Sequence, residues 1–249
     1  MRLDVPSVLS IAGSDPSGGA GIQADLRVYS ALNVYGMAVP AVLTAQNTLG
    51  VQQVQPIEPM FLETQIQVLL DDITPSAIKI GALGGAEQVE AVVRALSRYP
   101  GPIVLDPITV SSSGAALLDH AGLKALASSL VPKTTVITPN LDEWLVLKPL
   151  IQESPPYVMV TGGTNSGQIR DTLHGPEGTL CWAHPAINTQ NTHGTGCSLS
   201  SAIAAQLALG QSVPKACELA ITFVTSALGR SKGLQLGHGK GGLLYEPER

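Results

Sequence analysis

Short apolar runs alternate with longer amphipathic segments along most of this 249-residue chain. A strand covered on both faces gives a short continuous apolar run, and a helix lying on a sheet gives an amphipathic stretch. Their alternation predicts repeated β-α-β units, and therefore an α/β protein with a mostly parallel sheet. We expect strands at 7–13, 36–46, 76–83, 102–108, 134–140 and 157–163, and helices at 19–33, 57–71, 84–98, 119–130 and 141–149.

The last third of the chain has a different pattern. Residues 168–187 alternate at period two about a Gly-Pro-Glu-Gly turn, which predicts a β-hairpin. Two helical patterns follow at about 195–209 and 214–230, and the Gly-rich tail predicts a loop with at most one short strand. Because no repeat, low-complexity tract or linker interrupts these elements, we expect a single domain over residues 1–249.

Composition excludes several classes of partner. The net charge of −5 argues against nucleic acid and anionic membranes, since both bind basic surfaces. Three cysteines, Cys181, Cys197 and Cys217, lack metal-ligand spacing and indicate reduced thiols in a cytoplasmic protein. The first residues lack the pattern of a signal peptide, and no apolar run has membrane-spanning length.

Unusual residues follow four of the predicted strands. These are "GSDPSGGAG" (13–21), "AQNT" (45–48), "LDP" (105–107) and "TPN" (138–140). Open α/β sheets bind ligands at the carboxyl ends of their strands. Loops also collect Gly, Pro and Asn for conformational reasons, but four such loops at one edge favour a binding site.

A further glycine-rich stretch begins the helical pattern at 195–209. Gly194, Thr195, Gly196 and Cys197 replace the usual polar helix caps, so backbone N–H groups can approach an anion such as a transferring phosphoryl group. A cysteine at this position is expected to lose its proton more easily than a free thiol. The alternative is a plain turn with a small buried cysteine.

Six motifs in order give the chain a family resemblance. They are "IAGSDPSGGAGIQADL" (11–26), "TAQNTLGV" (44–51), "IKIGAL" (78–83), "VLDPITVSSSG" (104–114), "TPNLDE" (138–143) and "NTHGTGCSLSSAIAA" (191–205). Together they resemble the hydroxymethylpyrimidine/phosphomethylpyrimidine kinases of the ribokinase-like superfamily, and the likeness spans nearly the whole chain. "TPNLDE" is shared across the superfamily, while the first and last motifs are specific.

The resemblance implies a ribokinase-like three-layer αβα sandwich, with a mostly parallel central sheet and a hairpin at one edge. It implies ATP- and Mg²⁺-dependent phosphorylation of 4-amino-5-hydroxymethyl-2-methylpyrimidine, then of its monophosphate, in thiamine biosynthesis. The expected partners are therefore the pyrimidine and ATP, with a second copy of the chain in a homodimer.

The resemblance also implies roles for single residues. Cys197 is the expected general base beside the anion hole of residues 194–196. The expected substrate contacts are Ala20, Asp25, Gln46, Ala82 and Thr109. The expected ATP contacts are Asn140, Thr161, Gly163 and His238, with Glu143 and Asp106 near Mg²⁺.

Several of these residues have a plainer interpretation. A Gln46 amide suits an aminopyrimidine edge because it offers a donor and an acceptor, but a glutamine also simply ends a strand. Asn140 and Glu143 can form the capping box of a helix at 141–149, alone or together with their role near the metal. Asp106 can serve only to shape an Asp-Pro turn.

The chain departs from the family at three places. Thr161 replaces the lysine of a Lys-Gly-Gly motif that normally approaches the ATP phosphates, and Ala82 replaces a methionine of the substrate pocket. Only residues 151–156 connect the helix at 141–149 to the next strand, where relatives insert a further helix. Two alternatives follow: a pyridoxal/pyridoxamine kinase, for which Ala82 leaves room, and a non-catalytic pyrimidine-binding homologue.

Overall fold

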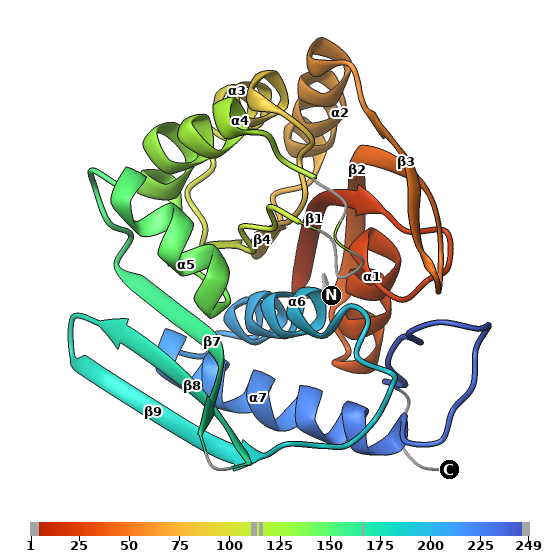
Figure 1. Ribbon diagram of the computed structural model, residues 1–249. Helices are drawn as coiled ribbons and strands as arrows, with labels where there is room; N and C mark the ends of the chain where they lie inside the picture. The colour runs from red at the N-terminus through yellow and green to blue at the C-terminus, as the bar shows by residue number, and fades with distance from the viewer. Residues whose placement is uncertain (1–4, 111–113, 115–116, 166, 246–249) are drawn as a thin grey trace.

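The computed structural model describes residues 5–110, 114, 117–165 and 167–245, and Figure 1 shows the helices gathered on both sides of a sheet. The nine described strands follow the order β3-β2-β1-β4-β5-β6-β7-β8-β9. Their bounds are β1 Ser7–Ser14, β2 Tyr35–Asn47, β3 Gly50–Pro56, β4 Ala77–Ile80, β5 Ile103–Leu105, β6 Val136–Ile137, β7 Tyr157–Asn165, β8 Gln168–Gly175 and β9 Gly178–Pro185.

The central strands are parallel and the outer ones antiparallel. β2, β1, β4, β5, β6 and β7 pair in parallel, so their carboxyl ends meet at one edge of the sheet. β3 pairs antiparallel with β2 at one side, and β8 and β9 extend the other side as the predicted hairpin. The predicted three-layer α/β architecture is confirmed.

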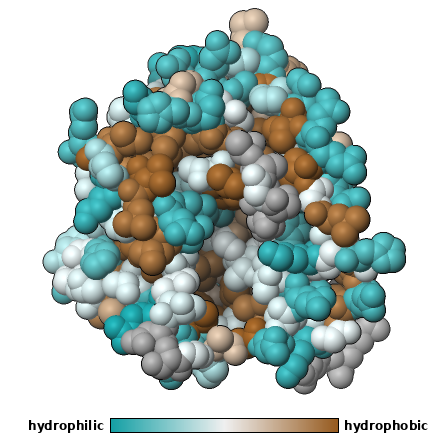
Figure 2. Space-filling model, viewed as in Figure 1, coloured by the Kyte–Doolittle hydropathy of each residue, from teal (hydrophilic) through white to brown (hydrophobic). Residues whose placement is uncertain are grey.

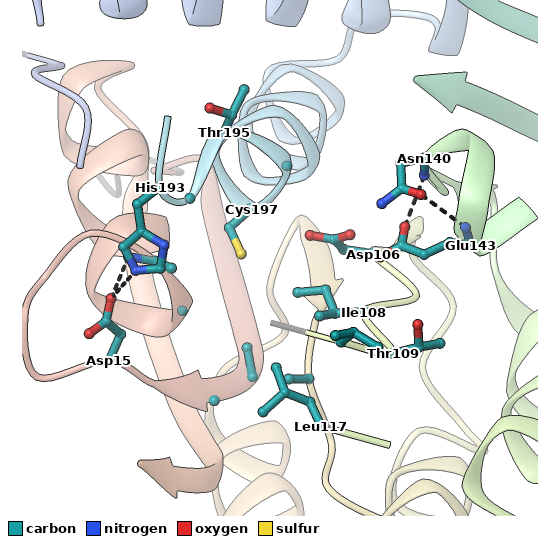
Figure 3. A pocket seen from close by; sticks show the side chains of 18 of the residues that line it. Asp15, Asp106, Ile108, Thr109, Leu117, Asn140, Glu143, His193, Thr195 and Cys197 are labelled. Atoms are coloured by element: carbon teal, nitrogen blue, oxygen red, sulfur yellow. Dashed lines mark hydrogen bonds and ion pairs between the residues drawn. The ribbon is translucent and has the colours of Figure 1, made fainter. Parts of the chain in front are cut away.

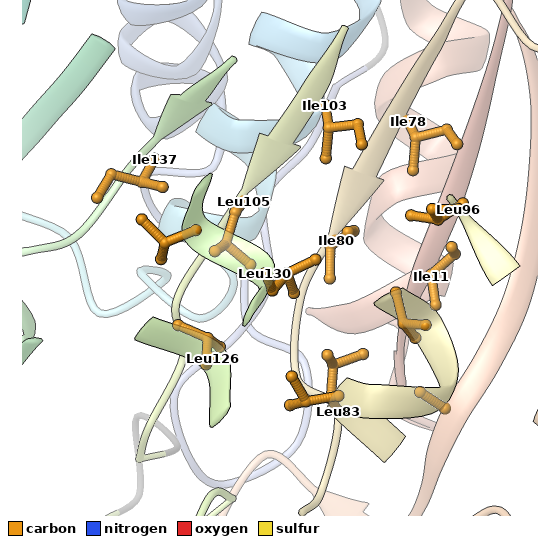
Figure 4. Packing of buried hydrophobic residues seen from close by; sticks show 14 of the residues in the cluster. Ile11, Ile78, Ile80, Leu83, Leu96, Ile103, Leu105, Leu126, Leu130 and Ile137 are labelled. Carbon is orange, nitrogen blue, oxygen red and sulfur yellow. The ribbon is translucent and has the colours of Figure 1, made fainter. Parts of the chain in front are cut away.

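Two hydrophobic cores join the helices to the sheet. One lies under α2 (Pro59–Asp72), α3 (Ala86–Ala95), α4 (His120–Ala125) and α5 (Leu141–Leu147); the other lies under α1 (Gly21–Ala31), α6 (Thr195–Ala208) and α7 (Val213–Arg230). Figure 4 shows Ile103 and Leu105 in the first core, whereas Val104 between them packs in the second. This two-sided burial is why the strands appear as continuous apolar runs.

Three elements differ from the prediction. β3 was not predicted, because Gly50–Pro56 is a half-exposed edge strand without an apolar run. β6 has only two residues, and the expected helix at 119–130 ends at Ala125 and continues as a π-helical turn, Leu126–Leu130. The tail forms no strand within the described residues 231–245.

None of the helices in the described part of the chain combines the length and apolar character needed to cross a membrane. Cys181 is exposed, Cys197 and Cys217 are buried, and all three are free thiols. The predicted motif at 104–114 lies partly outside the described residues.

Candidate active site

Two helices begin at the same point above the parallel strands. The N-caps of α1 and α6 are Ala20 and Gly194, and neither provides a side-chain hydrogen bond to its helix. Gly194 has a left-handed backbone (φ 79°), and a Cβ there would overlap the carbonyl oxygen of Gly19, so glycine is required. The first N–H groups of an uncapped helix have no intrahelical acceptor. The pair of helix starts therefore provides donors for an anion.

These helix starts form one side of a pocket of about 610 Å³. Figure 2 shows the molecule hollowed near its centre, and Figure 3 shows the side chains that converge there. Apolar side chains form much of the wall, so the pocket suits a flat ring beside polar groups. Those apolar residues are Ala12, Val42, Ala82, Ile108, Val110, Leu117 and Val146.

Most of the predicted site residues meet in this pocket. They come from both helix starts, from the end of β2, from β7, and from the segments that follow β4, β5 and β6. The residues brought together are Ala20, Gln46, Ala82, Asp106, Thr109, Asn140, Glu143, Thr161, Gly194, Thr195, Gly196 and Cys197.

Asp25 does not reach the pocket, so the predicted direct contact with substrate is corrected. Its carboxylate is fully buried behind the wall and forms an ion pair of 2.9 Å with Lys79. The hydroxyls of Ser10 and Ser201 also donate to it, at 2.6 and 2.7 Å. Lys79 itself lines the pocket, and sequence reasoning missed it although "IKIGAL" contains it.

Two predicted ATP contacts also lie elsewhere. Gly163 pairs with Arg170 in the β7–β8 ladder, where a Cβ would press on the Arg170 carbonyl oxygen at 3.2 Å. His238 is exposed in the tail, and the neighbouring Gly239 N–H donates to Thr48 at 3.2 Å. Neither residue lines the pocket: Gly163 lies in the sheet and His238 in an exposed loop, and their contact with ATP stays a prediction.

Cys197 lies between the two helix starts and Asp106 (Figure 3). The Gly21 N–H lowers the pKa of the Cys197 thiol, and Cys197 in turn lowers that of Asp106. Burial raises the pKa of the thiol to about 12, although Lys79 opposes the shift. The expectation of an easily lost proton is therefore wrong for this structure, because desolvation outweighs the helix N-terminus.

Asp106 and Glu143 point toward one another in Figure 3. Burial raises the pKa of Asp106 to about 6; burial together with the nearby Asp106 charge raises that of Glu143 to about 8. The capping box is present: Asn140 Oδ1 accepts from Glu143 N at 2.9 Å, and Glu143 Oε2 accepts from Asn140 N at 2.9 Å. No cluster of three His, Cys, Asp or Glu side chains suited to a metal occurs among the described residues.

A polar network near Gln46 was not foreseen. His193 Nε2 lies 2.8 Å from Asp15 Oδ2 and 3.0 Å from the Gln46 amide. The ring packs against Gly19, where a Cβ would collide with it, and its backbone N–H donates to Gly241. Both Asp15 and His193 stand in the motifs of the sequence, but only the folded chain shows that they touch.

Comparison with known proteins gives a consistent result. The family model for phosphomethylpyrimidine kinase matches residues 15–243. The hydroxymethylpyrimidine/phosphomethylpyrimidine kinase of Bacillus subtilis is 36% identical over 95% of this chain and 94% of its own.

Two solved structures are also similar. The phosphomethylpyrimidine kinase of Clostridium difficile has a TM-score of 0.78 and 35% identity, covering 90% of this chain and 100% of that one. The Staphylococcus aureus pyridoxal kinase in complex with AMP-PCP and pyridoxal has a TM-score of 0.86 and 27% identity, covering 98% and 94%.

Proposed function

The chain belongs to the phosphomethylpyrimidine kinase family, and on that premise we propose that it uses ATP to phosphorylate 4-amino-5-hydroxymethyl-2-methylpyrimidine in thiamine biosynthesis. We propose that it then phosphorylates the resulting monophosphate as well. The observation that carries the proposal is the meeting of two uncapped helix starts, Cys197 and Gln46 in one pocket. Phosphoryl transfer needs positioning and charge stabilisation more than covalent chemistry, and this arrangement offers both.

The helix starts act on the transferring phosphoryl group. N–H groups of Gly196 and Cys197 belong to the first turn of α6, where no intrahelical acceptor exists. They stabilise negative charge that develops on the phosphoryl oxygens, and the dipole of α6 adds to this effect. Gln46 binds the ring on the other side of the pocket.

Cys197 and Asp106 handle the proton of the substrate hydroxyl. The hydroxyl gives its proton to the Cys197 sulfur while the thiol proton passes to the carboxylate of Asp106, so no buried thiolate accumulates. Both side chains line the pocket and each alters the other's pKa, which supports this relay, as does the Asp106 pKa of about 6, which leaves it ionised at neutral pH. Lys79 stabilises the negative charges nearby.

Asp106 and Glu143 fit a Mg²⁺ ion that the nucleotide brings with it. Two facing carboxylates, of which Asp106 raises the pKa of Glu143, are suited to a divalent cation. A kinase Mg²⁺ needs only one or two carboxylates, since phosphates and water complete its shell. When bound, the ion neutralises phosphate charge. Asn140 and Thr161 lie beside these carboxylates and complete the nucleotide side of the pocket.

Product mass tests the proposal directly. Incubation of the protein with ATP, Mg²⁺ and the hydroxymethylpyrimidine should give the monophosphate and then the diphosphate. A product that stops at the monophosphate would limit the function to the first step. ATP left intact at saturating pyrimidine would favour the non-catalytic homologue instead.

A second candidate is pyridoxal kinase activity. Two observations favour it: the TM-score of 0.86 to the Staphylococcus aureus pyridoxal kinase, and the small Ala82 side chain on the pocket wall. We place it second because the Bacillus subtilis pyrimidine kinase has the higher identity, 36% against 27%. Comparison of kcat/KM for the pyrimidine and for pyridoxal decides between them.

We further propose a cytoplasmic homodimer in which residues 1–249 form one domain. A single sheet runs through the described residues, and all three cysteines are free thiols. Exposed apolar side chains on β2 and α2, among them Tyr35, Met60, Phe61 and Val68, give a surface that a second copy can cover. Light scattering on the purified protein measures the oligomeric state.

A further inference from the structure

The side chain of Gln46 is held at both ends of its amide. The atom placed as Nε2 lies 3.0 Å from His193 Nε2, and the atom placed as Oε1 lies 3.2 Å from the Thr44 hydroxyl. Thr44 also donates to the carbonyl oxygen of Ser14 at 2.8 Å. Because the oxygen and nitrogen ends of an amide have nearly the same size and shape, the protons of these neighbours decide which end is oxygen and which is nitrogen.

Asp15 is an acceptor in this network. It accepts from the Ser17 N–H at 2.8 Å, the Ser17 hydroxyl at 2.7 Å and the Ala20 N–H at 2.9 Å. Burial alone would raise the pKa of Asp15, but hydrogen bonds from His193 and Ser17 outweigh it and hold that pKa below its usual value. Asp15 is therefore a carboxylate and has no proton to give.

The negative charge of Asp15 determines which end of the Gln46 amide is the oxygen and which is the nitrogen. His193 Nε2 must carry a hydrogen, because it lies 2.8 Å from an acceptor-only carboxylate. The same N–H faces Gln46, so Oε1 is the end that lies there and accepts. Turning the amide over puts Nε2 at Thr44, whose oxygen can accept because its own hydrogen is directed to Ser14. The structure has the reverse order, with Gln46 Nε2 at His193, which sets two donors against each other there, so we assign the amide the other way round.

We propose that Asp15 and His193 are positioning residues that fix the order of acceptor and donor on Gln46, and thereby the orientation in which an aminopyrimidine ring enters the pocket. This inference rests on the proposed function. With both ends held, Gln46 retains one acceptor lone pair and one N–H for the ligand. An amino group beside a ring nitrogen matches that pair in one orientation, and a ring turned over sets donor against donor. The fixed amide therefore keeps the hydroxymethyl group on the side of Cys197.

The test compares two substrates that differ only in the amino group. We expect wild-type protein to prefer the aminopyrimidine over 5-hydroxymethyl-2-methylpyrimidine by about 10–100-fold in kcat/KM. His193→Phe keeps a ring against Gly19 but removes the donor, and the preference should fall to about threefold or less. His193→Gln returns an N–H near the Nε2 position and should restore most of the preference for the aminopyrimidine. His120→Phe, the same change at an exposed site, is the matched control.

A double variant separates positioning from a structural role. If His193 acts through Gln46, His193→Phe should have little further effect on the substrate preference of Gln46→Leu. A wild-type preference in His193→Phe, or an additive loss in the double variant, overturns the proposal. If circular dichroism shows that His193→Phe does not fold, the Thr44→Val variant tests the positioning role instead. It breaks the other amide contact and must also lower the preference, and an unchanged preference overturns the proposal.

The two proposals fail differently. If the wild-type protein phosphorylates neither pyrimidine, the proposed function is wrong. The positioning role is then tested by calorimetry, which compares the binding affinities of the same two pyrimidines for the same variants in place of kcat/KM. Turnover of both pyrimidines at equal rates by the wild-type protein leaves the kinase function standing and overturns the positioning role.

Discussion

Lys79 and Asp25 form an ion pair of 2.9 Å in which neither side chain has any exposure to solvent. Asp25 lies on α1 and Lys79 on β4, so the pair ties a helix that begins at the pocket to the centre of the sheet. Breaking such a pair leaves one charge buried without its partner, which costs far more than the pair itself contributes.

Lys79→Met should therefore destabilise the protein by about 3–5 kcal/mol in urea unfolding. Asp25→Asn should also destabilise it, because Lys79 is then the unpaired charge. The double variant Lys79→Met/Asp25→Asn should lose clearly less than the sum of the two. Additive losses would mean that the two charges do not stabilise each other.

Asp106 should make stability fall as the pH rises. Its pKa is about 6 in the folded protein against an ordinary 3.8, because burial disfavours the charge. Between these values the unfolded chain binds fewer protons than the folded one, so the free energy of unfolding decreases with increasing pH. Asp106→Asn should remove this part of the decrease between about pH 4 and pH 6. If the free energy of unfolding depends on pH identically in the wild-type protein and in Asp106→Asn, the raised pKa of Asp106 is contradicted.

Thr161→Lys should tighten ATP binding. Lys79 is the only Lys or Arg among the described pocket residues, and Asp25 pairs with it, so no other ammonium or guanidinium faces the nucleotide. A lysine at position 161 adds a partly screened charge worth about 1 kcal/mol, or roughly fivefold in the KM for ATP. Thr161→Val controls for the loss of the hydroxyl. Equal or weaker ATP binding by the lysine variant indicates that the phosphates lie elsewhere.

The sequence predicted the sheet well where burial leaves a local signal. Ile103, Val104 and Leu105 face two different cores in turn, so the whole strand is apolar and stands out. Gly50–Pro56 carries no such signal, because an edge strand needs little more than its partner's backbone. Its pairing with β2 could be seen only in the folded chain.

The site was predicted in its outline and missed in its electrostatics. Strand ends and glycine-rich helix starts identified the pocket, since those patterns are local. The pKa of Cys197 could not be foreseen in the same way. It depends on Lys79 and Asp106, which are more than 90 residues away in sequence, and on burial that no motif encodes.

Cys197 is the residue on which the proposed chemistry depends most. It lines the pocket together with Asp106, whose charge raises the pKa of its thiol, and it lies at the first turn of α6. Cys197→Ala and Cys197→Ser should lower kcat by about 10²–10⁴ while ATP and pyrimidine binding stay close to wild type, because only the proton transfer is lost. Cys181→Ser, which changes an exposed thiol outside the pocket, is the matched control.

Cys197→Asp separates a chemical role from packing. A carboxylate accepts a proton at lower pH than a thiol whose pKa is about 12, so this variant should keep part of the activity with a more acidic optimum. If the side chain only fills space at the helix start, alanine should instead be fully active and aspartate inactive. Full activity of the alanine variant would leave the backbone N–H groups of α6 as the sole contribution of this turn to the reaction.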